Sequence, residues 1–117
     1  MIPKQFRLKN KFAFDATYKI RHSTHSGGVT LYAGLEKSSE EYLTKVGFVV
    51  SKKTHKRAVK RNRLKRLMRE SYRNLLKSNE LGNSNKYRSL IFIGTSNALE
   101  ADYNKIHKSM KKMLETI

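Results

Sequence analysis

One amphipathic segment constrains the fold of this chain more than any other feature. Residues 57–70 read RAVKRNRLKRLMRE, in which Leu64, Leu67 and Met68 recur three and four residues apart, the spacing of one face of an α-helix. The side of the same helix opposite these apolar residues is basic. A domain that contains this segment must bury one side of a long helix, roughly Ala58 to Lys77, and leave a cationic side in solvent.

The charge on this helix has a single sign. No acidic residue occurs from Tyr42 to Arg69, and ten of the eighteen residues from Lys52 to Arg69 are Lys or Arg. Exposed helices usually mix charges, because opposite charges four residues apart stabilise a helix by about 0.2–0.5 kcal/mol and like charges cost about as much. An ordinary solvated face therefore explains the segment poorly, and the pattern predicts a binding site for a polyanion. The candidate residues for this site are Arg57, Lys60, Arg61, Asn62, Arg63, Lys65, Arg66, Arg69 and Arg73.

The whole chain favours the same kind of partner. Its 117 residues include 26 Lys and Arg against nine acidic residues, a formal net charge of +17, and such self-repulsion favours a polyanionic partner. Nucleic acid is the first candidate and an anionic membrane surface the second. No apolar run reaches the roughly 18 residues of a membrane span, and no signal peptide is recognisable, so we expect a cytoplasmic protein. The length predicts a single domain over residues 1–117.

The remaining segments predict a mixed α+β domain. Asn10 can cap a short helix that runs to about Arg21, and the polar residues from His22 to Gly28 are expected to form a loop. A last amphipathic helix is predicted over Ala98 to Ile117. The expected order is α-β-β-α-β-α, with a hairpin joining the first two strands. Three runs rich in β-branched and aromatic residues predict the strands, at Val29–Leu35, Lys45–Ser51 and Tyr87–Gly94.

Aromatic residues form a second candidate surface. Phe14 and Tyr18 stand four residues apart on the first expected helix, and Tyr32 lies on the first expected strand. Aromatic rings beside cations suit unpaired nucleotides, whose stacking contributes about 1–3 kcal/mol per base. Taken alone, however, the pattern favours the simpler interpretation that these rings belong to the core.

We expect no catalytic residue and no metal site in the protein itself. A two-metal nuclease needs clustered carboxylates to hold ions about 4 Å apart, whereas the acidic residues here are scattered along the chain. His22 and His25 in HSTH are interpreted as residues of a polar loop rather than as ligands or an acid–base pair. The chain has no cysteine, which excludes disulfides and thiolate metal sites, and no phosphate-binding loop or Ser-His-Asp pattern is visible.

Two motifs resemble the bacterial ribonuclease P protein component. KVGFVVSKK at residues 45–53 precedes AVKRNRLKRLMRE at residues 58–70, and the order Arg-Asn-Arg-x-Lys-Arg-x-x-Arg from Arg61 to Arg69 is the most specific part of the resemblance. FRLKNKFAFDATYK at residues 6–19 and TLY at residues 30–32 extend it over nearly the whole chain. The segment THKRAV departs from the family's usual Gly-Asn-Ala-Val turn, so the entry to the helix is expected to differ.

The resemblance implies an accessory subunit of a ribonucleoprotein endonuclease. Such a subunit binds the catalytic RNA through its basic helix and assists removal of the 5′ leader from precursor tRNA, with Mg²⁺ held mainly by the RNA. The implied partners are ribonuclease P RNA and precursor tRNA, without a membrane or an obligatory protein partner. The implied fold is like the second domain of ribosomal protein S5, with a left-handed βαβ crossover around the basic helix. The cleft residues implied to bind the leader are Phe14, Tyr18, Tyr32, Lys52 and Lys53.

Two other functions remain open from the residues alone. A structural RNA-binding protein of ribosomal type would use the same basic helix, but its affinity for precursor tRNA would not depend on the leader. A stand-alone metal-dependent nuclease would cleave RNA without a partner and would need its carboxylates to do so.

Overall fold

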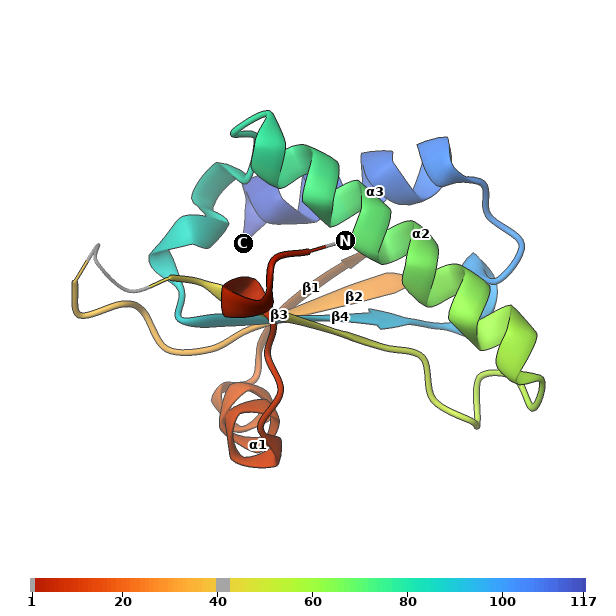
Figure 1. Cartoon of the computed structure of the whole chain (residues 1–117), viewed down its shortest axis with the longest axis horizontal. Helices are drawn as coiled ribbons and strands as arrows, with labels where there is room; N and C mark the ends of the chain where they lie inside the picture. The colour runs from red at the N-terminus through yellow and green to blue at the C-terminus, as the bar shows by residue number, and fades with distance from the viewer. Residues whose placement is uncertain (1, 40–42) are drawn as a thin grey trace.

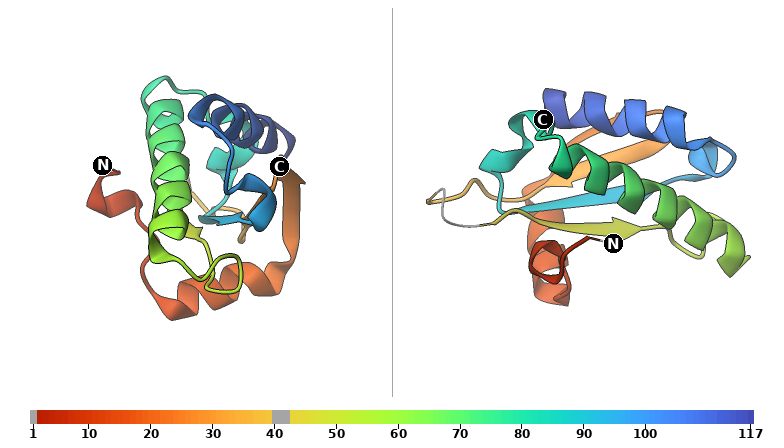
Figure 2. Two further views of the ribbon diagram at one scale, coloured as in Figure 1. Left: turned by 90° about the vertical axis from the view of Figure 1, so that its right-hand side faces the viewer. Right: turned by 45° about the horizontal axis from the view of Figure 1, so that its top comes forward.

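The computed structural model describes residues 2–39 and 43–117, which form a four-stranded sheet with helices on both faces (Figure 1). Helices α2 (Ala58–Lys77) and α3 (Tyr103–Thr116) lie on one face, and α1 (Lys11–Ile20) lies on the other (Figures 1 and 2). The 3₁₀ helices η1 (Lys4–Phe6), η2 (Gly82–Lys86) and η3 (Ser96–Ala98) occupy connections. The strands are β1 (His22–Ser26), β2 (Val29–Ala33), β3 (Lys45–Val49) and β4 (Ser89–Gly94). The expected mixed α+β fold is confirmed.

The last strand in the chain lies inside the sheet. The strand order is β1-β2-β4-β3, in which β4 pairs antiparallel with β2 and parallel with β3. Leu90, Ile91 and Phe92 are fully buried, because a strand that is apolar on both sides needs cover on both faces. Helix α2 connects the parallel strands β3 and β4, and the two views show that this crossover is left-handed (Figures 1 and 2). Nearly all such connections are right-handed, so only the resemblance anticipated this one.

Two expectations about the sheet are wrong. The segment from His22 to Gly28 is not a polar loop, because it contains β1, which pairs antiparallel with β2. The turn between them has positive φ at both Gly27 (57°) and Gly28 (84°), the backbone that suits a two-residue hairpin. The expected hairpin between β2 and β3 does not form, because β4 lies between these strands.

The core lies between the sheet and the apolar faces of α2 and α3. Leu64, Met68 and Leu75 are fully buried there, each a burial of about 1.5–3 kcal/mol. Tyr72 joins them by packing between Phe48 and Phe92, with ring centroids 6.1 and 5.8 Å away. The bounds predicted for this helix agree with α2.

The C-terminal helix begins later than the sequence predicts. Residues 96–98 form η3, and α3 starts at Tyr103 after Asp102, whose carboxylate accepts a hydrogen bond from the backbone N–H of Lys105 (2.9 Å). This N-cap fixes the start of α3, because it satisfies a backbone donor that the first helical turn leaves without a partner. The predicted apolar face is otherwise observed, with Ile106, Met110 and Met113 buried.

Candidate nucleic-acid interface

The exposed side of α2 carries polar side chains that no other described residue binds. Asn62, Arg66 and Arg69 are exposed and Lys65 is half-buried, and these four residues lie three and four positions apart along one face. Arg57 stands at the N-cap of the same helix with an exposed side chain. Within residues 2–39 and 43–117, none of these five side chains makes a hydrogen bond or an ion pair. This set, the free basic face, is therefore available to an external anion.

Two arginines of the same motif bind the protein's own backbone instead. Arg61 Nη1 donates to the carbonyl oxygens of His55 (2.7 Å) and Lys56 (3.0 Å), and so shapes the turn that leads into α2. Arg63 donates from Nη1 to the carbonyl oxygen of Leu99 (2.9 Å) and from Nη2 to that of Ala101 (3.1 Å). The sequence predicts both as RNA-binding residues, whereas the structure gives each a role in holding a neighbouring segment.

Two further candidates on α2 form weak ion pairs with acidic residues. Lys60 Nζ lies 3.6 Å from Glu100 Oε1, and Arg73 Nη2 lies 3.4 Å from Glu70 Oε1. Such partly exposed pairs contribute little, about 0–1 kcal/mol, so a phosphate can compete for either cation. The Arg73 Nε atom is buried without a hydrogen-bond partner among the described residues, which limits how far this side chain can reach outward.

Helix α1 is fixed over the other face of the sheet by three contacts. Phe14 lies against Gly47, where an added Cβ would stand 2.5 Å from the ring, so only glycine allows this approach. Thr17 Oγ1 and Ser89 Oγ share a hydrogen bond of 2.6 Å. Tyr18 meets Tyr32 edge to face, with ring centroids 5.2 Å apart.

The aromatic candidates are therefore brought together at one end of this face. Tyr32, Ile91 and Gly47 form one row across three strands, and α1 covers it. Phe14, Tyr18 and Tyr32 are all half-buried, so each ring contributes to packing and keeps an accessible edge. The sequence allows these rings to be either core residues or accessible rings. Each ring is partly buried and partly accessible, so neither interpretation alone describes it.

The next row of the sheet is less covered, and it includes a residue that sequence reasoning missed. Strand pairing aligns His25, Thr30, Ile93 and Val49 on the same face as Tyr32, and each is half-buried or exposed. We call these four residues the open row. His25 belongs to it only because the segment from His22 to Ser26 is a strand. The Gly-Gly pair after this segment is the signal that could have identified the hairpin.

The two candidate lysines lie beyond the open row, on the side away from α1. Lys52 and Lys53 are exposed in the turn that follows β3, beyond Val49 (Figure 1). A strand rises about 3.3 Å per residue, so Val49 lies about 7 Å along β3 from Gly47 beneath Phe14, and the lysines follow Val49 in the turn. The aromatic rings and the lysines therefore mark the two ends of one strip rather than a single pocket.

Burial raises the pKa of the Tyr18 phenol above its usual range, and the neighbouring Tyr32 and Asp15 raise it further. The phenol therefore remains protonated at neutral pH, where it can donate a hydrogen bond to an anionic or carbonyl oxygen. Tyr18 therefore adds no negative charge at this end of the strip, which suits a polyanionic ligand.

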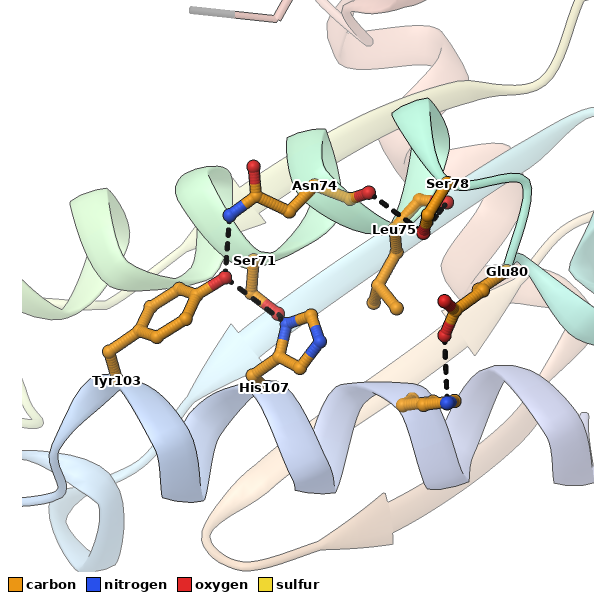
Figure 3. Close-up of polar contacts among 8 residues, drawn as sticks. Ser71, Asn74, Leu75, Ser78, Glu80, Tyr103 and His107 are labelled. Atoms are coloured by element: carbon orange, nitrogen blue, oxygen red, sulfur yellow. Dashed lines mark hydrogen bonds and ion pairs between the residues drawn. The ribbon is translucent and has the colours of Figure 1, made fainter.

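His22 and His107 contact structural neighbours, and the described residues hold no metal cluster. His107 Nδ1 lies 2.9 Å from Ser71 Oγ between α2 and α3 (Figure 3). His22 Nε2 lies 3.3 Å from Tyr87 Oη. Across residues 2–39 and 43–117, no group of three or more His, Asp or Glu side chains could hold an ion. In the same residues, no helix has the length and apolarity to cross a bilayer.

Comparison with known proteins gives a consistent match over the whole chain. A sequence model of the family described as Ribonuclease P matches residues 2–117. The ribonuclease P protein component of Synechococcus sp. (strain JA-2-3B'a(2-13)) is 33% identical over 116 residues, covering 98% of this chain and 84% of the relative. The corresponding component of Microcystis aeruginosa is 34% identical over 115 residues, covering 97% of this chain and 91% of the relative.

Solved structures show the same fold. The RNase P protein of Staphylococcus aureus matches with a TM-score of 0.75 at 25% identity, covering 95% of this chain and 94% of that chain. The RNase P protein of Thermotoga maritima matches with a TM-score of 0.75 at 19% identity, covering 95% and 96%. These matches favour the ribonuclease P interpretation over the ribosomal-type and stand-alone nuclease alternatives. The chain therefore belongs to the family of ribonuclease P protein components, the protein subunits of a ribonucleoprotein endoribonuclease that processes tRNA.

Proposed function

We propose that the free basic face of α2 binds the catalytic RNA, and that the strip from α1 across the open row to Lys52 and Lys53 binds the 5′ leader of precursor tRNA. One observation carries the proposal: the two surfaces lie on different elements and opposite faces of the sheet, and each has the chemistry of a different RNA contact. Exposed Arg side chains suit the phosphates of a folded RNA, because their planar fork binds phosphate oxygens in pairs. Half-buried rings suit unpaired bases.

The protein's part in the reaction is to bind and position RNA. The protein binds the catalytic RNA and the leader at the same time. The precursor tRNA therefore contacts both the protein and the RNA in one complex, which raises its affinity. Cations near the RNA also reduce its negative charge, and we propose that Mg²⁺ is then bound by the RNA at lower concentration. We expect such a subunit to act in the cytoplasm, where precursor tRNA is made.

Reconstitution with a bacterial ribonuclease P RNA tests the function directly. At low Mg²⁺, adding the protein should increase the rate of leader cleavage, and the affinity gain should depend on leader length. An unchanged cleavage rate would contradict the subunit role. Affinity that stays constant as the leader is trimmed would contradict the assignment of the strip.

Two substitutions separate the surfaces. Arg66→Ala should weaken assembly with the catalytic RNA, whereas Tyr18→Ala should leave assembly nearly unchanged and weaken precursor binding by about 1–3 kcal/mol, the contribution of one stacked base. Tyr18→Phe is the matched control, because it keeps the ring against Tyr32 and should retain most of the affinity. Equal effects of Arg66→Ala and Tyr18→Ala in both assays would show that the surfaces are not distinct.

A further inference from the structure

A pocket lies at the outer edge of β3, between the two proposed RNA surfaces. Its volume is about 360 Å³, and the N-terminal segment borders it by running along β3, where the N–H of Leu8 donates to the carbonyl oxygen of Val46 (2.8 Å). Figure 1 shows this segment passing in front of β3, with α2 above and α1 below. We call this the β3-edge pocket. Its lining residues are Ile2, Arg7, Leu8, Lys9, Phe14, Val46, Gly47, Phe48 and Arg69.

The lining combines an apolar wall with cations and has no acidic group. Leu8 and Val46 are buried, and the half-buried rings of Phe14 and Phe48 supply the accessible apolar surface of the wall. Arg69, from the free basic face, reaches the pocket without a partner among the described residues. The only titratable side chains among the lining residues are those of Arg7, Lys9 and Arg69. The pocket therefore favours a ligand with an apolar planar part and a negative charge.

Arg7 is held in place by the protein. Its Nε donates to the carbonyl oxygen of Ile2 (2.9 Å), which fixes the guanidinium plane and leaves the two terminal nitrogens for another acceptor. A guanidinium held in this way binds a phosphate at lower entropic cost than a free side chain. Small-ligand sites have volumes of about 300–1,000 Å³. This pocket is near the lower limit of that range, so we expect it to hold no more than one nucleotide.

We propose that the β3-edge pocket binds one unpaired nucleotide of the catalytic RNA, with its base against Leu8 and Phe14 and its phosphate between Arg7 and Arg69. The catalytic RNA is the partner because Arg69 is continuous with Lys65 and Arg66 on α2, whereas no residue of the open row lines the pocket. This inference rests on the proposed function and adds a third contact, which links the two surfaces.

The first test locates a mononucleotide on the full chain. Adenosine 5′-monophosphate should shift the methyl resonances of Ile2, Leu8 and Val46, and inorganic phosphate or adenosine alone should bind more weakly. Arg69→Ala should weaken this binding about tenfold, the equivalent of about 1.4 kcal/mol. The matched control is Lys112→Ala, which removes one positive charge on α3 outside the pocket and should change the affinity less than about twofold. Resonance shifts confined to Val49 and Ile93, or equal losses of nucleotide affinity in both variants, would contradict binding in this pocket.

The second test identifies the RNA that supplies the nucleotide. The chain has no cysteine, so a single Lys9→Cys carries an aryl azide at one known position. In the reconstituted complex, this probe should crosslink to an unpaired nucleotide of the catalytic RNA, and Lys112→Cys on α3 should not. Crosslinks to the leader alone, or to duplex RNA, would overturn the assignment. If cleavage is stimulated but the mononucleotide does not reach the pocket, only the pocket is wrong; if the pocket binds but cleavage is not stimulated, the proposed function is wrong.

Discussion

At the scale of single residues, two arginines three positions apart on α2 differ in what they bind. Arg63 binds the carbonyl oxygens of Leu99 and Ala101 in the segment before α3, whereas Arg66 has no partner among the described residues. Both belong to the same sequence motif, and the resemblance implies that both bind RNA. The difference arises because the segment from Leu99 to Ala101 passes beside α2, a long-range contact that spacing within one helix does not contain.

Arg63→Ala should therefore destabilise the free protein. It removes two hydrogen bonds from a charged donor and leaves two carbonyl groups without that partner, so the free energy of unfolding should fall by about 1–3 kcal/mol. Arg66→Ala, an exposed change of the same size, should alter it by less than about 0.5 kcal/mol. Urea denaturation of both variants measures the difference. Equal stability losses would show that the Arg63 contacts do not stabilise the fold.

A buried phenol should set an alkaline limit on stability. Tyr72 is 1% exposed, and burial raises the pKa of its phenol far above the usual value of about 10. Above pH 10 the unfolded chain releases this proton and the folded chain keeps it, so the free energy of unfolding falls with pH, by at most about 1.4 kcal/mol per pH unit. Below pH 10 both states hold the proton, and this residue adds no pH dependence.

Tyr72→Phe should reduce the fall in unfolding free energy above pH 10. The ring stays between Phe48 and Phe92, so packing is kept and only the titrating hydroxyl is lost. Urea denaturation of both proteins at several values between about pH 9 and 11.5 gives the two slopes. A variant slope as steep as the parent's would mean that other groups cause the alkaline loss.

At the scale of elements, the sequence predicts those whose pattern is local and strong. The bounds of α2 follow from a stripe of Leu and Met at helical spacing that has to be buried. Strand β1 was missed because HSTHS has no apolar residue, so its alternation between the two faces leaves no hydrophobic signal. The position of β4 between β2 and β3 depends on pairing between distant segments. Its apolar run indicated burial on both faces but did not identify its neighbours.

Helices α2 and α3 are joined by a polar network, whose coupling is measurable (Figure 3). Ser71 Oγ lies 2.9 Å from His107 Nδ1, and Asn74 Nδ2 donates to Tyr103 Oη at 2.7 Å. Ser71 is fully buried, so removing its partner leaves a buried hydroxyl with fewer hydrogen bonds.

A double-mutant cycle on Ser71→Ala and His107→Ala should give a coupling free energy of about 0.5–1.5 kcal/mol, the net contribution of one hydrogen bond. Ser71→Ala paired with Lys108→Ala, an exposed neighbour on α3, should give values near zero. The measurement is the free energy of unfolding of each single and double variant. Additive effects for Ser71 and His107 would mean that the contact at 2.9 Å does not hold the helices together.

At the scale of the whole molecule, salt acts on the free protein and on the complex in opposite directions. A net charge of +17 on 117 residues destabilises the compact chain through self-repulsion, and added salt screens this repulsion. We expect the melting temperature of the free protein to rise with ionic strength. Binding to RNA depends instead on releasing counterions from phosphates, so the same salt weakens the complex.

The slope of the logarithm of the binding constant against the logarithm of the salt concentration reports how many cationic side chains contact phosphate. If the four cations of the free basic face together with Lys60 and Arg73 neutralise about six phosphates, the log–log slope for the catalytic RNA should be about −4 to −6. Arg66→Ala should make the slope shallower by about 1, and Lys108→Ala, an exposed lysine on α3, should leave it unchanged. If both variants reduce the slope equally, the attraction comes from the net charge spread over the molecule. If only Arg66→Ala does, the attraction is local to α2, because counterions are released only where phosphates and cations meet.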